Sequence, residues 1–235
     1  MKLGILNAFP PDESIIDWRD TPVDAYIRFL ELVRPPFDYV GYDVARGQFP
    51  DSPDACDAYL ITGSPKGVYE SEAWISELAK FIREAYQAGI KLVGICFGHQ
   101  ILAQALGGHC EKSEKGWGLG LKSFQISRQK AWMTANSATC SLHFVHQDQV
   151  IHLPPEAELL GGNDFCPNLF FTISDGVLGI QGHPEFTKDM MQDILEARKD
   201  IFGQQVYETA MRSMESGTPD NQLLAQWVVN FLLRK

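Results

Sequence analysis

The chain has 235 residues, 45% of them hydrophobic and 21% charged, which is an ordinary composition for a globular protein with one large core. Its formal net charge of -10 argues against a general binder of nucleic acid or of anionic membranes, because both would repel it. Five cysteines without a Cys-x-x-Cys pair, and the lack of an apolar run long enough for a signal peptide or a membrane span, predict a single cytoplasmic domain over residues 1–235, without disulfides or a zinc ribbon.

The first half of the chain alternates short apolar runs with amphipathic stretches. Strands are expected at residues 3–8, 39–44, 58–62 and 90–95, and helices at residues 23–33 and 72–88. Thr21 and Pro22 are typical start signals for the first helix. Strands that alternate with helices imply right-handed crossovers, and therefore a mostly parallel sheet with helices on both faces.

The second half changes to closely spaced β-rich runs, followed by two helical patterns at the end. The β runs are at residues 119–127, 141–150, 169–174 and 177–180, and the helical patterns are at residues 188–201 and 221–233. Turn signals separate the β runs, at Gly161-Gly162-Asn163-Asp164 and at Asp175-Gly176. The sequence therefore predicts an α/β fold: a mostly parallel central sheet flanked by helices, with a small antiparallel β addition.

The most informative segment is Gly94-Ile95-Cys96-Phe97-Gly98, which ends the strand at residues 90–95 and leads into a helix expected at residues 100–106. A sharp strand-to-helix turn lifts its central side chain from the backbone, and the glycines leave room for the turn and for a substrate. The helix N-terminus also favours a thiolate over a thiol. We therefore expect Cys96 to be a nucleophile; the alternative is a small buried core residue.

Two further motifs follow strands of the same predicted sheet, where reactive groups collect. Gly63-Ser64-Pro65 forms a turn that can direct a backbone N–H at an anion, although an ordinary turn has the same composition. After the return strand comes Gln181-Gly182-His183-Pro184-Glu185. His183 can act as base for Cys96, and Glu185 can orient His183, which predicts a Cys96, His183 and Glu185 triad. The alternative for the last motif is a solvated loop.

The remaining histidines do not indicate a metal site. His143 and His146 lie three apart on one expected strand, so they face opposite sides of the sheet, and no cysteine or carboxylate cluster completes a ligand set. His99 is expected on the helix after Cys96, and His109 and His152 in loops or at the surface. The sequence predicts neither a metal nor another cofactor.

Together these motifs resemble those of the class I, triad-type glutamine amidotransferases, especially the glutaminase domain of GMP synthase and free-standing relatives. The resemblance covers about residues 55–190 and implies the family's flavodoxin-like fold. It also implies that Cys96 attacks the carboxamide of a γ-glutamyl substrate, releases ammonia or an amine, and leaves a thioester that water hydrolyses. By the same resemblance the backbone N–H groups of Ser64 and Phe97 form the oxyanion hole. The remaining substrate-binding residues that it implies are Gly63, Gln100, His146 and Asp148.

The chain departs from the family pattern in two places. Ser64 stands where the family usually has glycine, and only about fifty residues follow Phe186, so no synthetase domain is expected after it. Gly47-Gln48-Phe49-Pro50-Asp51, together with the motifs above, is also similar to γ-glutamyl peptidases, which cleave glutathione-type peptides. The leading interpretation is a free-standing glutaminase-like hydrolase for glutamine or a γ-glutamyl peptide. The alternatives are a γ-glutamyl peptidase, and a partner-dependent or inactive module that binds a ligand or a separate synthetase or acceptor subunit.

Overall fold

The computed structural model describes residues 1–10, 18, 21–134 and 137–234. In these residues nine strands form one central sheet in the order β2-β1-β3-β4-β11-β10-β9-β6-β7. Five neighbouring strands run parallel: β1 (Lys2–Leu6), β2 (Asp38–Tyr42), β3 (Ala58–Ile61), β4 (Lys91–Ile95) and β11 (Val177–Ile180). Four antiparallel strands extend the sheet: β6 (Gly118–Ile126), β7 (Thr139–His146), β9 (Glu158–Gly162) and β10 (Phe170–Ile173). The predicted α/β fold with a mostly parallel core is confirmed. That residues 1–235 form a single domain stays a prediction.

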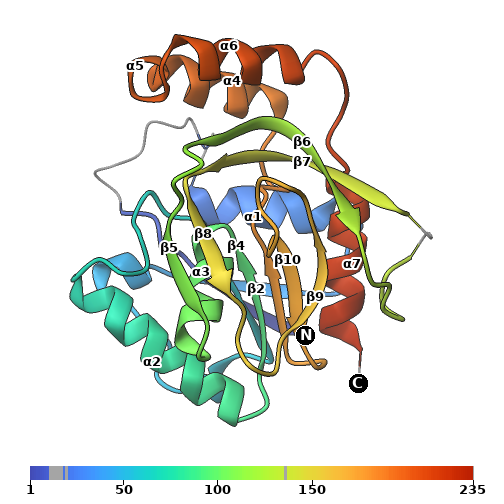
Figure 1. Cartoon of the computed structure of the whole chain (residues 1–235). Helices are drawn as coiled ribbons and strands as arrows, with labels where there is room; N and C mark the ends of the chain where they lie inside the picture. The colour runs from blue at the N-terminus through green and yellow to red at the C-terminus, as the bar shows by residue number, and fades with distance from the viewer. Residues whose placement is uncertain (11–17, 19–20, 135–136, 235) are drawn as a thin grey trace.

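Helices cover both faces of the parallel strands, as the alternating pattern predicts (Figure 1). One face carries α1 (Pro22–Glu31) and α7 (Asn221–Leu233), and the other carries α2 (Ala73–Gln87) and α3 (Phe97–Ala105). Every side chain of β3 and β11 is buried, as expected for strands packed on both faces. Two short 3-10 helices lie in the connections, at Val44–Arg46 and Pro53–Ala55.

The start of α1 follows the predicted signals and fixes the position of one buried side chain. Thr21 caps the helix: its hydroxyl accepts a hydrogen bond from the backbone N–H of Asp24, whose carboxylate accepts one from the N–H of Thr21. Pro22 occupies the first turn, where a missing N–H costs nothing. The helix is therefore anchored at its first turn, and Tyr26, one turn further on, is fully buried beneath it.

The antiparallel part differs from the sequence prediction in two places. The run at residues 141–150 is not one strand, because β7 ends at His146 and β8 (Asp148–His152) turns away to pair with β5 (His109–Lys112) in a separate ribbon. Gly161 and Gly162 are not turn residues but the end of β9. They are small because other backbone approaches them: a Cβ on Gly162 would lie 2.0 Å from the carbonyl oxygen of Pro167.

A third helical layer, which packs on β6 and β7, was predicted only in part (Figure 1). The helix expected at residues 188–201 is interrupted at Arg198, giving α4 (Lys188–Ala197) and α5 (Lys199–Phe202). It is followed by α6 (Gln204–Ser213), which has no counterpart in the sequence prediction. Of the side chains of α6, only Ala210 is fully buried. Val206, Tyr207, Ala210 and Met211 are nevertheless spaced as on one helix face, so the sequence carried a helical pattern that the prediction missed. Among the described helices, none has both the length and the apolar character needed to cross a membrane.

Candidate active site

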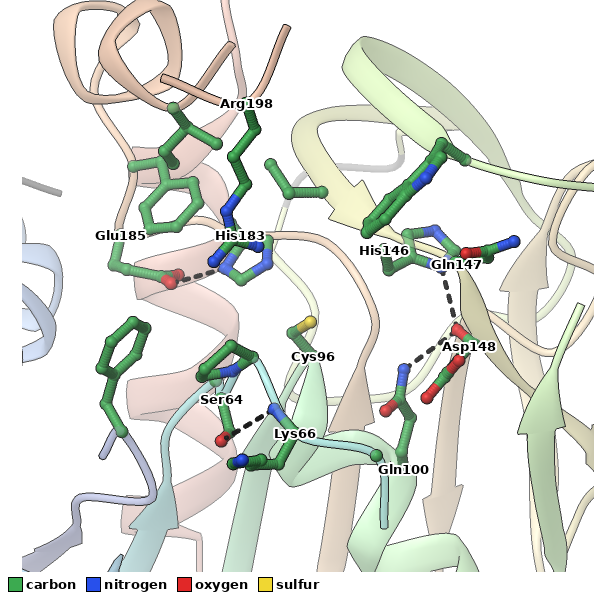
Figure 2. A pocket seen from close by; sticks show the side chains of 18 of the residues that line it. Ser64, Lys66, Cys96, Gln100, His146, Gln147, Asp148, His183, Glu185 and Arg198 are labelled. Carbon is green, nitrogen blue, oxygen red and sulfur yellow. Dashed lines mark hydrogen bonds and ion pairs between the residues drawn. The ribbon is translucent and has the colours of Figure 1, made fainter. Parts of the chain in front are cut away.

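The three motifs that the sequence places after strands meet at one edge of the sheet. β3, β4 and β11 are adjacent and parallel, so the residues after them lie at the same end of the sheet. A cavity of about 280 Å³ opens there, and Ser64, Cys96, His183 and Glu185 line it (Figure 2). The fold thus brings together residues more than a hundred positions apart in the chain.

Cys96 occupies a strained turn between β4 and α3. Its backbone has φ 54° and ψ -105°, a region that L-residues other than glycine rarely adopt and that costs about 1–3 kcal/mol. The turn is tight, because a Cβ on Gly94 would lie 2.3 Å from the Gly98 carbonyl oxygen, and one on Gly98 would lie 2.3 Å from that of Ile61. α3 begins directly at Phe97, not at residue 100. Cys96 is only 5% exposed, so its thiol faces the cavity rather than bulk solvent.

His183 and Glu185 form a buried pair beside Cys96. The Nδ1 atom of His183 donates to Oε1 of Glu185 at 2.7 Å, and both residues are at most 6% exposed. The ring of Phe186 stacks parallel on that of His183 at 4.2 Å, and the backbone N–H of His183 donates to the carbonyl of His143 at 2.8 Å. The segment is therefore a packed and oriented loop and not a solvated one.

The pKa of His183 depends on its neighbours Cys96 and Glu185. Burial alone lowers the pKa of His183, but the neighbouring Cys96 and Glu185 outweigh it and raise the pKa from 6.5 to about 10. Cys96 and Glu185 therefore both favour the protonated form of the His183 ring. This is the arrangement that an imidazolium–thiolate pair requires.

Tyr26 connects Glu185 to the loop after β3 through two hydrogen bonds, which the sequence did not reveal. Its hydroxyl donates to Oε1 of Glu185 at 2.9 Å and accepts from the backbone N–H of Gly63 at 2.7 Å. Burial and the charge of Glu185 hold the pKa of Tyr26 well above its usual value of 10.0, so the hydroxyl keeps the proton that it donates. Tyr26 looks like an ordinary apolar helix residue in the sequence, because its partner lies 159 positions away.

The expected oxyanion donors differ in how they reach the cavity. Ser64 lines it, and its hydroxyl accepts from the N–H of Lys66 at 3.3 Å, so the side chain serves the turn. The ring of Phe97 is buried and packs against Trp74 at 5.5 Å. Because Phe97 is the first residue of α3, its N–H has no acceptor within the helix. Gly63 lies close to the group, since a Cβ there would be 3.2 Å from Cε1 of His183.

The opposite wall of the cavity is the junction between β7 and β8. The Nε2 atom of Gln100 donates to the carbonyl of Asp148 at 3.0 Å, and the same carbonyl accepts from Nδ1 of His146 at 3.0 Å. Burial lowers the pKa of His146 to about 4, so the ring is neutral near pH 7. Gln100 and His146 therefore hold the backbone of Asp148 in place, while the side chain of Asp148 presents a carboxylate on this wall. Burial raises the pKa of Asp148, while a hydrogen bond from Tyr69 lowers it.

Comparison with known proteins identifies the family. The family model described as glutamine amidotransferase class-I matches residues 21–199. The chain belongs to the class I glutamine amidotransferase family. It is 32% identical over 201 residues to γ-glutamyl peptidase 3 of Arabidopsis thaliana, covering 81% of each chain. It is 29% identical over 137 residues to a GMP synthase of an Azoarcus species, covering 54% of this chain and 25% of that enzyme. A glutamine amidotransferase crystal structure from Thermotoga maritima superposes with a TM-score of 0.74 at 20% identity, covering 99% and 98% of the two chains.

The other four histidines do not line the cavity. His143 donates from Nδ1 to the carbonyl of Phe186 at 3.2 Å. His99 lies on α3 as expected, fully buried against Phe171, and burial lowers its pKa to about 3. His109 and His152 are exposed, as expected, but they face each other on strands of the β5–β8 ribbon rather than in loops. Within the described residues, no three His, Cys, Asp or Glu side chains are grouped so that they could hold a metal ion.

Proposed function

We propose that the protein is a cysteine-dependent hydrolase that cleaves γ-glutamyl amides through a glutamyl thioester. One observation carries the proposal: Cys96, His183 and Glu185 surround one cavity, with His183 oriented by the carboxylate and charged beside the thiol. A dead scaffold has no chemical need for all three groups in this arrangement.

The reaction follows from the positions of these groups. The Cys96 thiolate attacks the γ-carbonyl carbon, and the backbone N–H groups of Ser64 and Phe97 stabilise the oxyanion. The oxyanion collapses, the C–N bond breaks, and the His183 imidazolium gives its proton to the departing nitrogen. Water then loses a proton to His183 as it attacks the thioester, and glutamate leaves as the thiolate of Cys96 is restored. Glu185 keeps the ring in the tautomer that both steps need.

The glutamyl group is placed on the wall that contains Asp148. The carboxylate of Asp148 can pair with the α-ammonium of the substrate, and Gln100 and His146 fix the backbone of Asp148. A glutaminase and a γ-glutamyl peptidase would both use this wall. The similarity to γ-glutamyl peptidase 3 over 81% of both chains favours a peptide substrate as the second candidate beside glutamine.

Two further features belong to the proposal. All five cysteines are free and buried, which suits a reducing cytoplasm. A separate synthetase or acceptor subunit that receives ammonia is the partner a glutaminase would need, whereas a peptidase needs none. Turnover of glutamine that rises when such a subunit is added would support the glutaminase, and efficient cleavage of peptides by the isolated chain would support the peptidase.

The test is mass spectrometry of the intact protein during incubation with glutamine and a panel of γ-glutamyl peptides, with release of ammonia or amine followed in parallel. Wild type should gain one glutamyl group on Cys96, and Cys96→Ala should neither gain it nor release product. Cys140→Ala, a buried cysteine of β7 outside the cavity, is the matched control and should behave as wild type. Undiminished release by Cys96→Ala would overturn the mechanism, and no acylation by any compound would favour the binding-module interpretation.

A further inference from the structure

The charged residues of the cavity include three cations, although the chain as a whole is acidic. Lys66 is paired with Glu72 at 2.9 Å, and with Glu70 at 3.8 Å. Lys112 stands opposite Asp148 in the β5–β8 ribbon and lowers the pKa of that carboxylate. The third cation is Arg198, whose side chain makes no hydrogen bond or ion pair within the part of the chain that the structure describes. A substrate can therefore bind Arg198 without displacing another residue from it.

The break between α4 and α5 directs Arg198 toward the site. The residue is half-buried where the helix is interrupted, and its side chain extends from the helical layer into the cavity (Figure 2). Much of the cavity lining is apolar: Phe9, Trp18, Phe186 and Ile194 line it and belong to the same hydrophobic cluster as the buried side chains of α4. An arginine against such walls has few competing acceptors, so a carboxylate there forms a strong, charge-assisted contact.

The position of His183 tells which part of a substrate meets Arg198. The leaving nitrogen must face His183, because it receives its proton from that ring. Asp148 and Gln100 lie on the other side of Cys96, whereas Arg198 descends on the side of His183 (Figure 2). The glutamyl group therefore occupies the first side, and the leaving group extends toward Arg198.

We propose that Arg198 binds the carboxylate of the leaving residue, so that the preferred substrates are γ-glutamyl peptides whose leaving amino acid is apolar and keeps a free carboxylate. The inference rests on the proposed γ-glutamyl hydrolase function and narrows the range of its preferred substrates. Glutamine releases ammonia, which has no carboxylate, so it gains nothing from Arg198. The interruption at Arg198, which splits α4 from α5, then acts as a specificity element for the leaving group.

The test compares γ-glutamyl-leucine with γ-glutamyl-leucinamide, which differ only in the carboxylate. In wild type the ratio of kcat/KM for the acid to that for the amide should be roughly 10- to 100-fold, the range of a hydrogen-bonded charge pair. Arg198→Met should bring the ratio close to one, and Arg198→Lys should retain part of it, because lysine keeps the charge without the two-pronged geometry. Arg212→Met, on the exposed surface of α6, removes the same charge and should leave the ratio at the wild-type value.

The outcomes separate the two proposals. A wild-type enzyme that forms the thioester on Cys96 equally fast from acid and amide overturns the role of Arg198, and this comparison needs no variant to fold. A wild-type ratio that survives Arg198→Met also overturns it. An enzyme that is acylated by neither substrate, nor by any other γ-glutamyl compound, overturns the proposed function and this inference with it.

Discussion

Replacing Tyr26 by phenylalanine tests whether the hydroxyl under α1 positions Glu185, the residue proposed to orient His183. In the structure this hydroxyl donates to Glu185 at 2.9 Å and accepts from the N–H of Gly63 at 2.7 Å. Phenylalanine keeps the ring in the core and removes both hydrogen bonds. Glu185 then keeps its bond to His183 but loses the second contact of the same oxygen, while its other oxygen has no hydrogen-bond partner in the described structure.

The size of the effect follows from the kind of bond that is lost. A hydrogen bond to a charged group contributes about 1.5–3 kcal/mol, and a buried N–H left without a partner costs about 1–3 kcal/mol. If the first amount is lost from transition-state stabilisation, kcat/KM falls roughly 10- to 100-fold. The second amount, from Gly63, should appear as a lower free energy of unfolding. The loss of activity should lie mainly in kcat, because Tyr26 acts through Glu185 and the loop rather than on the glutamyl group.

The assay measures kcat and KM for a γ-glutamyl peptide well below the unfolding temperature, together with urea unfolding. Tyr39→Phe is the matched control, since it removes a hydroxyl that donates to Glu31 at 2.7 Å, away from the cavity. The control should retain the wild-type kcat. If Tyr26→Phe loses stability but keeps the wild-type kcat, the hydroxyl has a structural role only and the positioning argument is refuted.

Four further outcomes follow from the site. Gly63→Ala should reduce kcat strongly, because the new Cβ would lie 3.2 Å from His183, whereas Ser64→Ala should retain it because only the backbone N–H is used; equal losses would contradict the backbone assignment. In Cys96→Ala the pKa of His183, followed by NMR, should fall below the value of about 10 in wild type, and an unchanged pKa would remove the thiolate as its cause. Folding raises the pKa of His183 above 6.5, so the stability that its proton contributes is complete below that pH and is lost as the pH rises to about 10. The free energy of unfolding, measured with urea, should therefore fall more over this range in wild type than in Cys96→Ala. Parallel curves would contradict the coupling. Asp148→Asn should raise KM by roughly 10-fold or more through the lost charge pair while the backbone contacts remain, and an unchanged KM would move the glutamyl group elsewhere.

The sequence predicts the elements whose causes are local. Buried parallel strands are continuous apolar runs. The glycines around Cys96 indicate a tight turn, and in the structure neighbouring backbone lies too close to Gly94 and Gly98 for either to carry a Cβ. The motifs after β3, β4 and β11 could therefore be recognised one by one. That the three strands are neighbours could not be read from local pattern, since β11 follows β4 by about 80 residues and its place in the sheet depends on the whole topology.

What the sequence did not predict depends on distant partners. Tyr26 has the same pattern as any buried helix residue, and only the folded chain places Glu185 over its hydroxyl. The run at residues 141–150 has continuous β character, yet its second half pairs with β5 rather than with β6, which splits it at Gln147. The break at Arg198 likewise lacks a proline or glycine signal. The helix α6 is different, because Val206, Tyr207, Ala210 and Met211 recur at helical spacing and its pattern could have been recognised.

The origin of each wall of the cavity suggests how the chemistry and the specificity are divided. The residues proposed to react, Cys96 and His183, follow central strands, where the backbone is packed on both faces and a shift would disturb the core. The wall proposed for the leaving group comes from α4 and α5, which pack on the outer strands and meet the site only through their inner side chains. Changes in these helices can therefore alter what leaves without moving Cys96 relative to His183. On this reasoning a change at Arg198 should alter the order of preference among leaving groups while every substrate still passes through the same thioester.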